Sequence, residues 1–396
     1  MEIARAGEQA VSLGWRLRRR LLGPGIVRDA LRSAHPRRAL VLYTVWPFRV
    51  RKPTLTHQNL WQVIELTRAL DEIGYAVDVV EYDERNRDLL RGVYHLVIDL
   101  HPRDPTLYDG FLAPGARTIA YITGKNPAFS NAAELERLRD LERRRGARLR
   151  PRRQVPPFPK AKVEGFDGFF YFGDASTLDT YREFRLPPSF RLVNNGYDDV
   201  PPTDPAIRDP RRFLFLGGTG QVHKGLDLLL ELFSATPELE LTVCSPFRAE
   251  ADFARAYARE LHRMPNIRAA GFVDVRSGRF RELQAPCGTL LSPSCSEGQG
   301  GNVTVALSYG LPCVVGPNCG FDDPEIEVMP DCRGETLERL VGTRAAEDRA
   351  VLAARARASL ALMQRRYRPQ HYAEAIRSAL RAVADGTPRT GARTGA

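Results

Sequence analysis

Residues 213–225 read FLFLGGTGQVHKG, and residues 288–301, about seventy positions later, read GTLLSPSCSEGQGG. Each stretch opens with apolar residues that predict a buried parallel strand, continues through a glycine-rich turn, and leads into a periodic segment that predicts a helix. A strand, a glycine loop and a helix start together present backbone N–H groups to an anion. Glycine permits close approach of the ligand, and Lys224 adds a positive charge. The two stretches therefore predict the two edges of one diphosphate site.

The order and spacing of these loops resemble the C-terminal domain of retaining, family-four nucleotide-sugar glycosyltransferases. The likeness is strong over residues 210–320 and faint over residues 38–200. Members of that family have the GT-B fold, so the resemblance implies an α/β protein with two Rossmann-like, doubly wound domains that face a central cleft. The matching motifs are Lys224-Gly225, Pro293-Ser294, Glu297-Gly298 and Gly310-Leu311-Pro312.

The rest of the sequence agrees with two domains. Its 396 residues, 43% of them hydrophobic, are enough to bury two cores, and strand and helix patterns alternate on both sides of a Pro-rich stretch. The pattern also predicts continuous helices at 248–262 and 345–366. The predicted divisions are a basic N-terminal segment at 1–37, an N-terminal Rossmann-like acceptor domain at 38–200, a linker at 201–211, a C-terminal Rossmann-like nucleotide-sugar domain at 212–365, a helix at 366–385 that in this family crosses back to the first domain, and a disordered tail at 386–396.

Glycosyl transfer suggests roles for particular side chains. A departing nucleoside diphosphate carries two or more negative charges, and we expect Lys224 to stabilise them. The resemblance implies that Glu297 holds the donor sugar by accepting hydrogen bonds from its hydroxyls. His57, at the start of a helix on the cleft side, is placed to hydrogen-bond the donor or the acceptor. The predicted catalytic residues are thus Lys224, Glu297 and His57, and the predicted nucleotide-sugar contacts are Gly217, Gly218, Lys224, Val273, Glu297, Gly300, Gly301, Asn302 and Val303.

Two positions depart from the family pattern. Thr219 stands five residues before the lysine, where an arginine usually contacts the diphosphate, and Val305 stands where a second glutamate usually contacts the ribose. We expect Asn302, Thr304 or the main chain of 300–301 to take over the ribose contact. The departures leave open a non-catalytic relative that binds a nucleotide sugar or a protein partner. A sugar epimerase or a phosphorylase on the same fold is a further alternative.

Composition limits the cofactors and the compartment. The six cysteines show no metal-ligand spacing and predict reduced thiols, and no apolar run is long enough for a signal peptide core or a membrane span. No Asp-x-Asp motif indicates a metal-bound diphosphate. Together with the activity that the resemblance implies, we expect a cytoplasmic, metal-independent hexosyltransferase that has no cofactor. Its donor would be a UDP- or GDP-linked sugar and its acceptor a glycan or a lipid-linked molecule, in the synthesis of a cell-surface polysaccharide or glycolipid.

Basic residues gather in two segments. Residues 1–38 hold nine Arg against three acids, a net charge of +6, and residues 143–162 hold seven Arg and two Lys without an acid, a net charge of +9. No nucleic-acid-binding signature accompanies them, so we expect no nucleic-acid partner. Either these segments hold the protein at an anionic membrane surface, at its inner face, or they form a solvated basic face. The Arg- and Pro-rich stretch 148–162 predicts a mobile loop.

Overall fold

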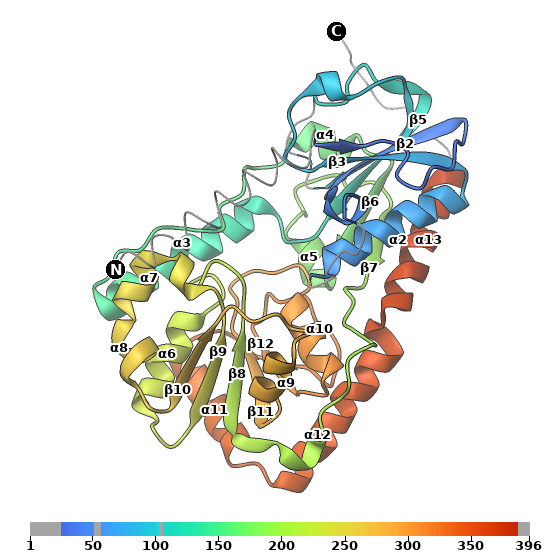
Figure 1. Cartoon of the computed structure of the whole chain (residues 1–396). Coiled ribbons are helices and arrows are strands. Elements are labelled where there is room, and N and C mark those ends of the chain that lie inside the picture. The colour runs from blue at the N-terminus through green and yellow to red at the C-terminus, as the bar shows by residue number, and fades with distance from the viewer. Residues whose placement is uncertain (1–24, 51–56, 101, 103–105, 387–396) are drawn as a thin grey trace.

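The computed structural model describes residues 25–50, 57–100, 102 and 106–386, which form two α/β domains with a mainly parallel sheet in each (Figure 1). The predicted α/β fold class with two doubly wound domains is confirmed. The first part of the basic segment, to residue 24, and the tail at 387–396 lie outside the described residues.

In the N-terminal domain the strands lie in the order β1-β3-β2-β4-β5-β6-β7. β1 pairs with β3 antiparallel, whereas neighbouring strands from β3 to β7 are parallel. Buried runs such as 39–43 suit a sheet that is covered on both faces. The bounds are β1 Ile26–Val27, β2 Arg37–Tyr43, α2 Gln58–Glu72, β3 Tyr75–Glu81, β4 Tyr94–Leu100, β5 Leu112–Ile122, α3 Pro127–Arg145, α4 Lys160–Glu164, β6 Gly168–Phe172, α5 Ala175–Asp179 and β7 Ser189–Leu192.

In the C-terminal domain the order is β10-β9-β8-β11-β12-β13, and the paired strands are parallel. The bounds of its strands are β8 Asp209–Leu216, β9 Glu240–Cys244, β10 Ile267–Gly271, β11 Cys287–Ser292, β12 Cys313–Val315 and β13 Glu327–Val328. Its helices are α6 Leu226–Ala235, α7 Ala251–Ala256, α8 Ala258–Arg263, α9 Gly278–Gln284, α10 Gly301–Ser308, α11 Gly334–Ala345 and α12 Arg349–Leu362, followed by a π-helical turn at Met363–Tyr367 and by α13 Pro369–Asp385.

Each sheet has a point at which the direction of winding reverses. In the N-terminal sheet it lies between β2 and β4, and in the C-terminal sheet between β8 and β11. Loops at the carboxyl ends of the strands beside such a point leave a crevice between them, where ligands bind in open α/β sheets. The two glycine-rich loops follow β8 and β11, so the strand order alone places them side by side.

The last helix leaves the C-terminal domain and packs on the N-terminal one. In Figure 1, α12 and α13 run from the lower domain to the upper one, where α13 lies beside α2. Tyr372, Ile376 and Leu380 are buried in the same apolar cluster as the β2 and β4 side chains. The Tyr372 hydroxyl lies 2.9 Å from the Tyr121 hydroxyl of β5. α13 is therefore part of the N-terminal core.

An arm reaches in the opposite direction. We use the name arm for residues 127–159, which comprise α3 and the irregular stretch after it. Leu138 and Leu141 of α3 are buried in the apolar cluster of the C-terminal domain. The same cluster contains Phe215 of β8 and Leu226 of α6. Burial of a leucine side chain stabilises by about 2 kcal/mol. The arm thus completes the core of the second domain although it follows β5 of the first.

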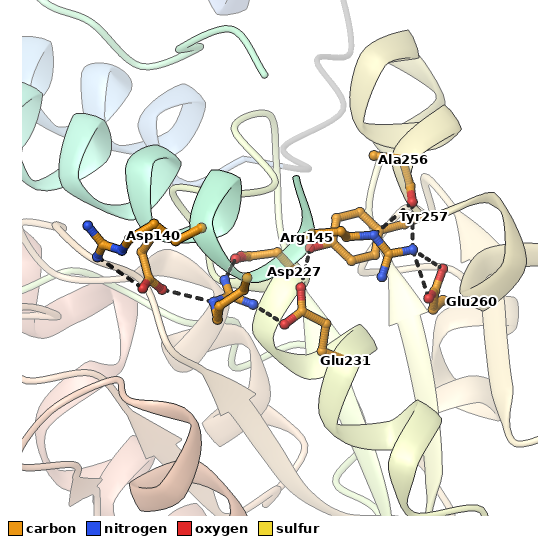
Figure 2. Close-up of polar contacts among 9 residues, drawn as sticks. Asp140, Arg145, Asp227, Glu231, Ala256, Tyr257 and Glu260 are labelled. Carbon is orange, nitrogen blue, oxygen red and sulfur yellow. Dashed lines mark hydrogen bonds and ion pairs between the residues drawn. The ribbon is translucent and has the colours of Figure 1, made fainter. Parts of the chain in front are cut away.

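Ion pairs fix the end of α3 to the C-terminal domain (Figure 2). Arg144 donates to Asp227 at 2.8 Å and also pairs with Glu231. Arg145 donates to both oxygens of Glu260 at 2.9 Å, and its guanidinium carbon lies 4.1 Å from the centre of the Tyr257 ring. Much of the positive charge at 143–162 is therefore paired inside the molecule.

The stretch predicted as a mobile loop is anchored. It has no regular secondary structure before α4, but the N–H groups of Arg152 and Arg153 donate to the buried Glu134 carboxylate at 2.9 Å. Asn131 exchanges two hydrogen bonds with the main chain of Val155, at 2.8 and 2.9 Å. Because α3 supplies these partners, the stretch follows the helix back along its length.

Neither membrane spans nor disulfides are found in the described part of the chain. None of its helices is both long and apolar enough to cross a membrane. All six cysteines are free, and Cys244, Cys287, Cys295, Cys313 and Cys319 are buried.

Candidate functional site

A cavity of about 350 Å³ lies between the domains at the ends of β8 and β11. Its volume falls within the range of small-molecule sites, and both domains line it. Of the residues predicted to form the site, it brings together His57, Gly217, Gly218, Lys224, Val273, Glu297, Gly301 and Asn302. Gly300 and Val303 are not among the described residues that line it.

Lys224 and Glu297 form an ion pair on the C-terminal side of the cavity. Burial opposes ionisation of Glu297, but the attraction of Lys224, followed by that of His223 and Arg153, outweighs burial and lowers the carboxyl pKa to about 2. Glu297 is therefore an acceptor at neutral pH, and it has lone pairs to spare for hydroxyl groups. A cation and an acceptor thus lie side by side in the cleft.

The first glycine-rich loop offers fewer backbone donors than expected. The buried Glu250 carboxylate accepts from the N–H groups of Gly220 and Gln221, the latter at 3.1 Å. The Gly217 N–H donates to the Cys244 carbonyl at 3.0 Å. The expectation that this loop presents its N–H groups to an anion is therefore wrong at these three positions, because other protein atoms already accept from them. The charged group that the loop presents to the cavity is Lys224, beside Gly217 and Gly218.

The second loop presents the start of a helix. α10 begins at Gly301 after Gly300, and Gly301 and Asn302 line the cavity. The first N–H groups of a helix have no acceptor within it, and the helix dipole adds positive potential there. The Asn302 amide nitrogen donates to Leu216 O at 3.0 Å and to Ser292 Oγ at 2.9 Å, which fixes the side chain at the cavity wall. The Val303 side chain is fully buried in the core.

Two histidines behave differently in the cleft. His57 caps α2, and its Nδ1 accepts from the Asn59 N–H at 3.4 Å. Desolvation in the cleft, then the charges of Lys224 and Arg153, lower its pKa to about 4, so the imidazole is neutral at physiological pH. His223 was not predicted to have a role, yet its Nε2–H donates to the Ser296 carbonyl at 2.7 Å and joins the two loops.

An apolar wall lies beside these polar groups. Val273 and Val305 are buried, and both line the cavity with Leu216. Phe272 lines it too, and 75% of this residue is exposed. The stretch 271–273 was predicted to contact the base through main-chain groups, with Val273 as the contact, and no role was predicted for the Phe272 side chain. Phe272 follows Gly271, which has a φ of +76° and turns the chain at the end of β10. The wall presents an aromatic ring and aliphatic groups to a ligand.

The N-terminal domain contacts the second loop directly. Gln58 of α2 donates to the Gly301 carbonyl at 3.0 Å, and the Asn194 N–H donates to the Gln299 side chain at 2.6 Å. The Thr304 hydroxyl donates to main-chain oxygens in this contact region. Thr304 therefore stabilises the domain contact and does not line the cavity.

Arg153 of the arm also lines the cavity, although no motif predicted it as a site residue. Its aliphatic stem lies on Gly220, where a Cβ atom would be only 2.6 Å from Arg153 Cγ. Among the described lining residues, Lys224 and Arg153 are the cations and Glu297 is the carboxylate. In the described parts of the molecule, no group of three or more His, Cys, Asp or Glu side chains could hold a metal ion.

No protein-family model matches this sequence, and none of the curated proteins matches it. Solved structures do resemble the fold. Sucrose-phosphate synthase from Thermosynechococcus elongatus aligns with a TM-score of 0.62 at 13% identity, over 88% of this chain and 100% of that one. HepE from Anabaena, in complex with UDP-glucose, aligns with a TM-score of 0.57 at 13% identity, over 87% and 99% of the two chains.

TarM is a third similar structure, with a TM-score of 0.53 and 12% identity over 74% of this chain. This chain spans only 55% of the length of TarM. At such identities the likeness establishes the fold alone. The chain has the GT-B fold of nucleotide-sugar glycosyltransferases.

Proposed function

We propose that this protein is a glycosyltransferase that moves a sugar from a nucleoside-diphosphate sugar to a glycan or lipid-linked acceptor. The observation that carries the proposal is the pairing of Lys224 and Glu297 beside the start of α10, in a cleft that both domains line. The site combines a cation, a helix start and a hydroxyl acceptor, which are the groups a sugar diphosphate requires. The UDP-glucose complex of HepE, which has a similar fold, supports a nucleotide-sugar donor.

Transfer breaks the bond between the sugar anomeric carbon and the diphosphate oxygen, which keeps the electron pair. The acceptor oxygen bonds to the same carbon, and its proton passes to the departing diphosphate oxygen. Lys224 and the α10 start stabilise the charge on the departing diphosphate, while Glu297 holds the sugar hydroxyls. We propose that transfer needs no metal ion and proceeds with retention of the anomeric configuration, as the resemblance implies.

The nucleoside is proposed to lie along the apolar wall. Phe272 offers a ring for the base, and Val273 packs beside it. Val305, only 3% exposed, cannot accept a hydrogen bond from ribose hydroxyls. We assign that contact to the Asn302 side chain, whose amide nitrogen is already bonded and whose oxygen remains an acceptor. A strong preference for the ribo over the 2′-deoxy donor would support this assignment, and indifference would remove it.

We propose that the N-terminal basic segment, residues 1–38, binds an anionic membrane surface. The enzyme would there transfer a hexose in the synthesis of a cell-surface polysaccharide or glycolipid. The arm contributes less than its sequence suggests, because Arg144, Arg145 and Arg152 pair with acids of the C-terminal domain. Each basic residue near an anionic leaflet adds about 1 kcal/mol. Binding to anionic vesicles should weaken steeply with salt. Equal binding to neutral vesicles would contradict the proposal.

The test is incubation of the whole protein with a panel of UDP- and GDP-linked sugars and oligosaccharide or lipid-linked acceptors, in excess chelator. Product analysis over time should reveal transfer with the anomeric configuration of the donor. An inverted product would contradict retention, and loss of activity in chelator would contradict metal independence. Epimerised sugar would favour the epimerase. Failure to bind any nucleotide sugar at millimolar concentration would favour a non-catalytic relative, the alternative to which Val305 points.

A further inference from the structure

We propose that Arg153, carried across the cleft by the arm, is a second cation for the donor diphosphate and replaces the arginine that Thr219 lacks. The inference rests on the proposed function, since it concerns how that site binds its donor. Arg153 follows β5 and α3 in the chain, whereas Lys224 follows β8. The diphosphate would thus be held between two cations, Arg153 from the arm and Lys224 from the C-terminal domain.

The position of the Arg153 stem carries the proposal. It packs on Gly220, where a Cβ atom would lie 2.6 Å from Arg153 Cγ and 3.1 Å from Cδ. Gly220 has a φ of +85° and directly follows Thr219, which is exposed. A glycine at this point leaves room for the arginine stem to cross the loop. The stem therefore crosses the first glycine-rich loop at Gly220, one residue after position 219, and Arg153 lines the cavity.

The main chain of the arm holds Arg153 in place. The Glu134 carboxylate accepts from the Arg153 N–H at 2.9 and 3.1 Å. The neighbouring Arg152 pairs with Asp252, and Val155 is fixed through two hydrogen bonds with Asn131. The residues on both sides are anchored, so the side chain starts from a defined position.

Charge balance in the cleft points to an anion. Lys224 is offset by Glu297, and His57 is neutral above pH 4. Arg153 therefore supplies the net positive charge of the described lining residues. Its guanidinium forms no ion pair in the described part of the chain, in contrast to those of Arg144, Arg145 and Arg152, although its charge acts on Glu297.

The positive charge of Arg153 acts on side chains of the proposed donor site. It contributes to lowering the pKa values of Glu297, His223 and His57, after larger contributions in each case. A planar guanidinium binds phosphate oxygens through two parallel hydrogen bonds, which a lysine cannot do. Arg153 would thus orient the diphosphate while Lys224 neutralises it.

The experiment compares Arg153→Gln with Arg150→Gln, which removes the same charge from an exposed side chain of the arm that does not line the cavity. Affinities for UDP and GDP are measured by calorimetry, and those for uridine and guanosine by ligand-observed NMR. Arg153→Gln should weaken binding of the preferred diphosphate by about 10-fold or more, as expected when a charged hydrogen-bond partner is lost. Binding of the matching nucleoside should not change.

A rescue variant completes the test. Adding Thr219→Arg to Arg153→Gln restores an arginine within the loop, at an exposed position, and should recover most of the diphosphate affinity. Equal diphosphate affinity in Arg153→Gln and Arg150→Gln would overturn the proposal while leaving the proposed function standing. An equal loss of nucleoside affinity would also overturn it, because the arginine would then act on the shape of the site. If the unchanged protein binds neither UDP nor GDP, the proposed function itself fails.

Discussion

Lys224 holds Glu297 in its charged form. Lys224 lowers the pKa of the Glu297 carboxyl group. The carboxylate in turn remains paired with the Lys224 ammonium group until an anion competes for it. A donor diphosphate would therefore share Lys224 with Glu297. This arrangement keeps the lysine in place, since a lone lysine side chain has many rotamers to lose.

Replacing Lys224 tests its role in turnover. Lys224→Ala should lower kcat for sugar transfer by about 100-fold or more, within the range seen when one preorganised donor to a developing anion is removed. Lys160→Ala, which removes an exposed lysine paired with Glu164, is the control and should keep full activity. Steady-state kinetics with the cognate donor provide the measurement. Unchanged kcat in Lys224→Ala would remove this residue from the reaction.

The lowered pKa of His57 predicts how folding stability depends on pH. Its pKa is about 4 in the folded protein and about 6.5 in an unfolded chain, so between these values the unfolded state binds more protons. Folding stability should therefore rise with pH across this window through His57. His57→Asn keeps a capping side chain and should flatten the rise, as urea unfolding at about pH 4.5 and 7 would reveal. An NMR titration with a His57 midpoint near 6.5 would contradict the prediction.

At the scale of elements, α3 shows how a strongly charged helix is used inside a protein. Asp227 in the first turn of α6 is fully buried, and burial raises its pKa to about 6 against the pull of Arg137 and Arg144. The Arg144 side chain, 27% exposed, is its hydrogen-bonded cation, whereas the side chain of Arg143, one residue earlier, is 71% exposed. One face of the helix is thus structural and the other is solvated.

This contrast predicts unequal effects of two neighbouring substitutions. Arg144→Gln should destabilise the protein by about 3 kcal/mol, because it leaves a buried carboxylate without its hydrogen-bonded cation. Arg143→Gln should cost less than about 1 kcal/mol, since its pair with Asp140 is exposed to water. Chemical denaturation of both variants at neutral pH provides the comparison. Similar losses of unfolding free energy in the two variants would mean that the Arg144–Asp227 pair does not hold the arm on the C-terminal domain.

Most strands and helices of the fold could be predicted from apolar periodicity, but the two-residue strands β1 and β13 were not. The glycine-rich loops gave β8, β11 and α10 to within a few residues. The predicted helix at 248–262 is instead α7 and α8, which are separated at Tyr257. α11, at Gly334–Ala345, was missed, and the helix predicted at 345–366 starts later because Asp348 caps α12. Only the late start of α12 is a boundary error, of the kind expected where helix propensity is weak and capping decides.

The site could be predicted only where its residues lie in the motifs. Lys224 was identified from its glycine-rich loop and Glu297 from the family resemblance of the second loop, and the structure brings them together. Glu250 was missed because it lies thirty positions after Gly220 and no motif marks it. Arg153 was assigned to a basic surface, since only the fold of the arm brings it to Gly220. Long-range placement of charged side chains has no local sequence signal.

At the scale of the whole molecule, two bridges join the domains in opposite directions. The arm runs from the first domain into the core of the second, and α13 runs from the second onto the core of the first (Figure 1). Each bridge buries apolar side chains in the other domain. Separation of the domains would therefore expose apolar surface in both, so hinge opening is opposed at two places.

Small-angle scattering can test this restraint. The unchanged protein should scatter as a single conformation that fits the structure, because its bridges hold the domains together. The double variant Arg144→Gln, Arg145→Gln removes the ion pairs at the end of α3 and should increase the radius of gyration. Arg143→Gln is the control. If the unchanged protein already spreads over open conformations, the arm does not restrain the hinge.

The two bridges also make the protein poorly modular. Residues 127–159 are encoded with the first domain but complete the second, and α13 is encoded with the second but completes the first. Recombination at the Pro-rich linker, the natural crossover point between two such halves, would separate each core from a helix that it needs. An exchange of the acceptor-facing half, by evolution or by protein engineering, must therefore transfer a discontinuous piece of the gene and leave the arm with its host.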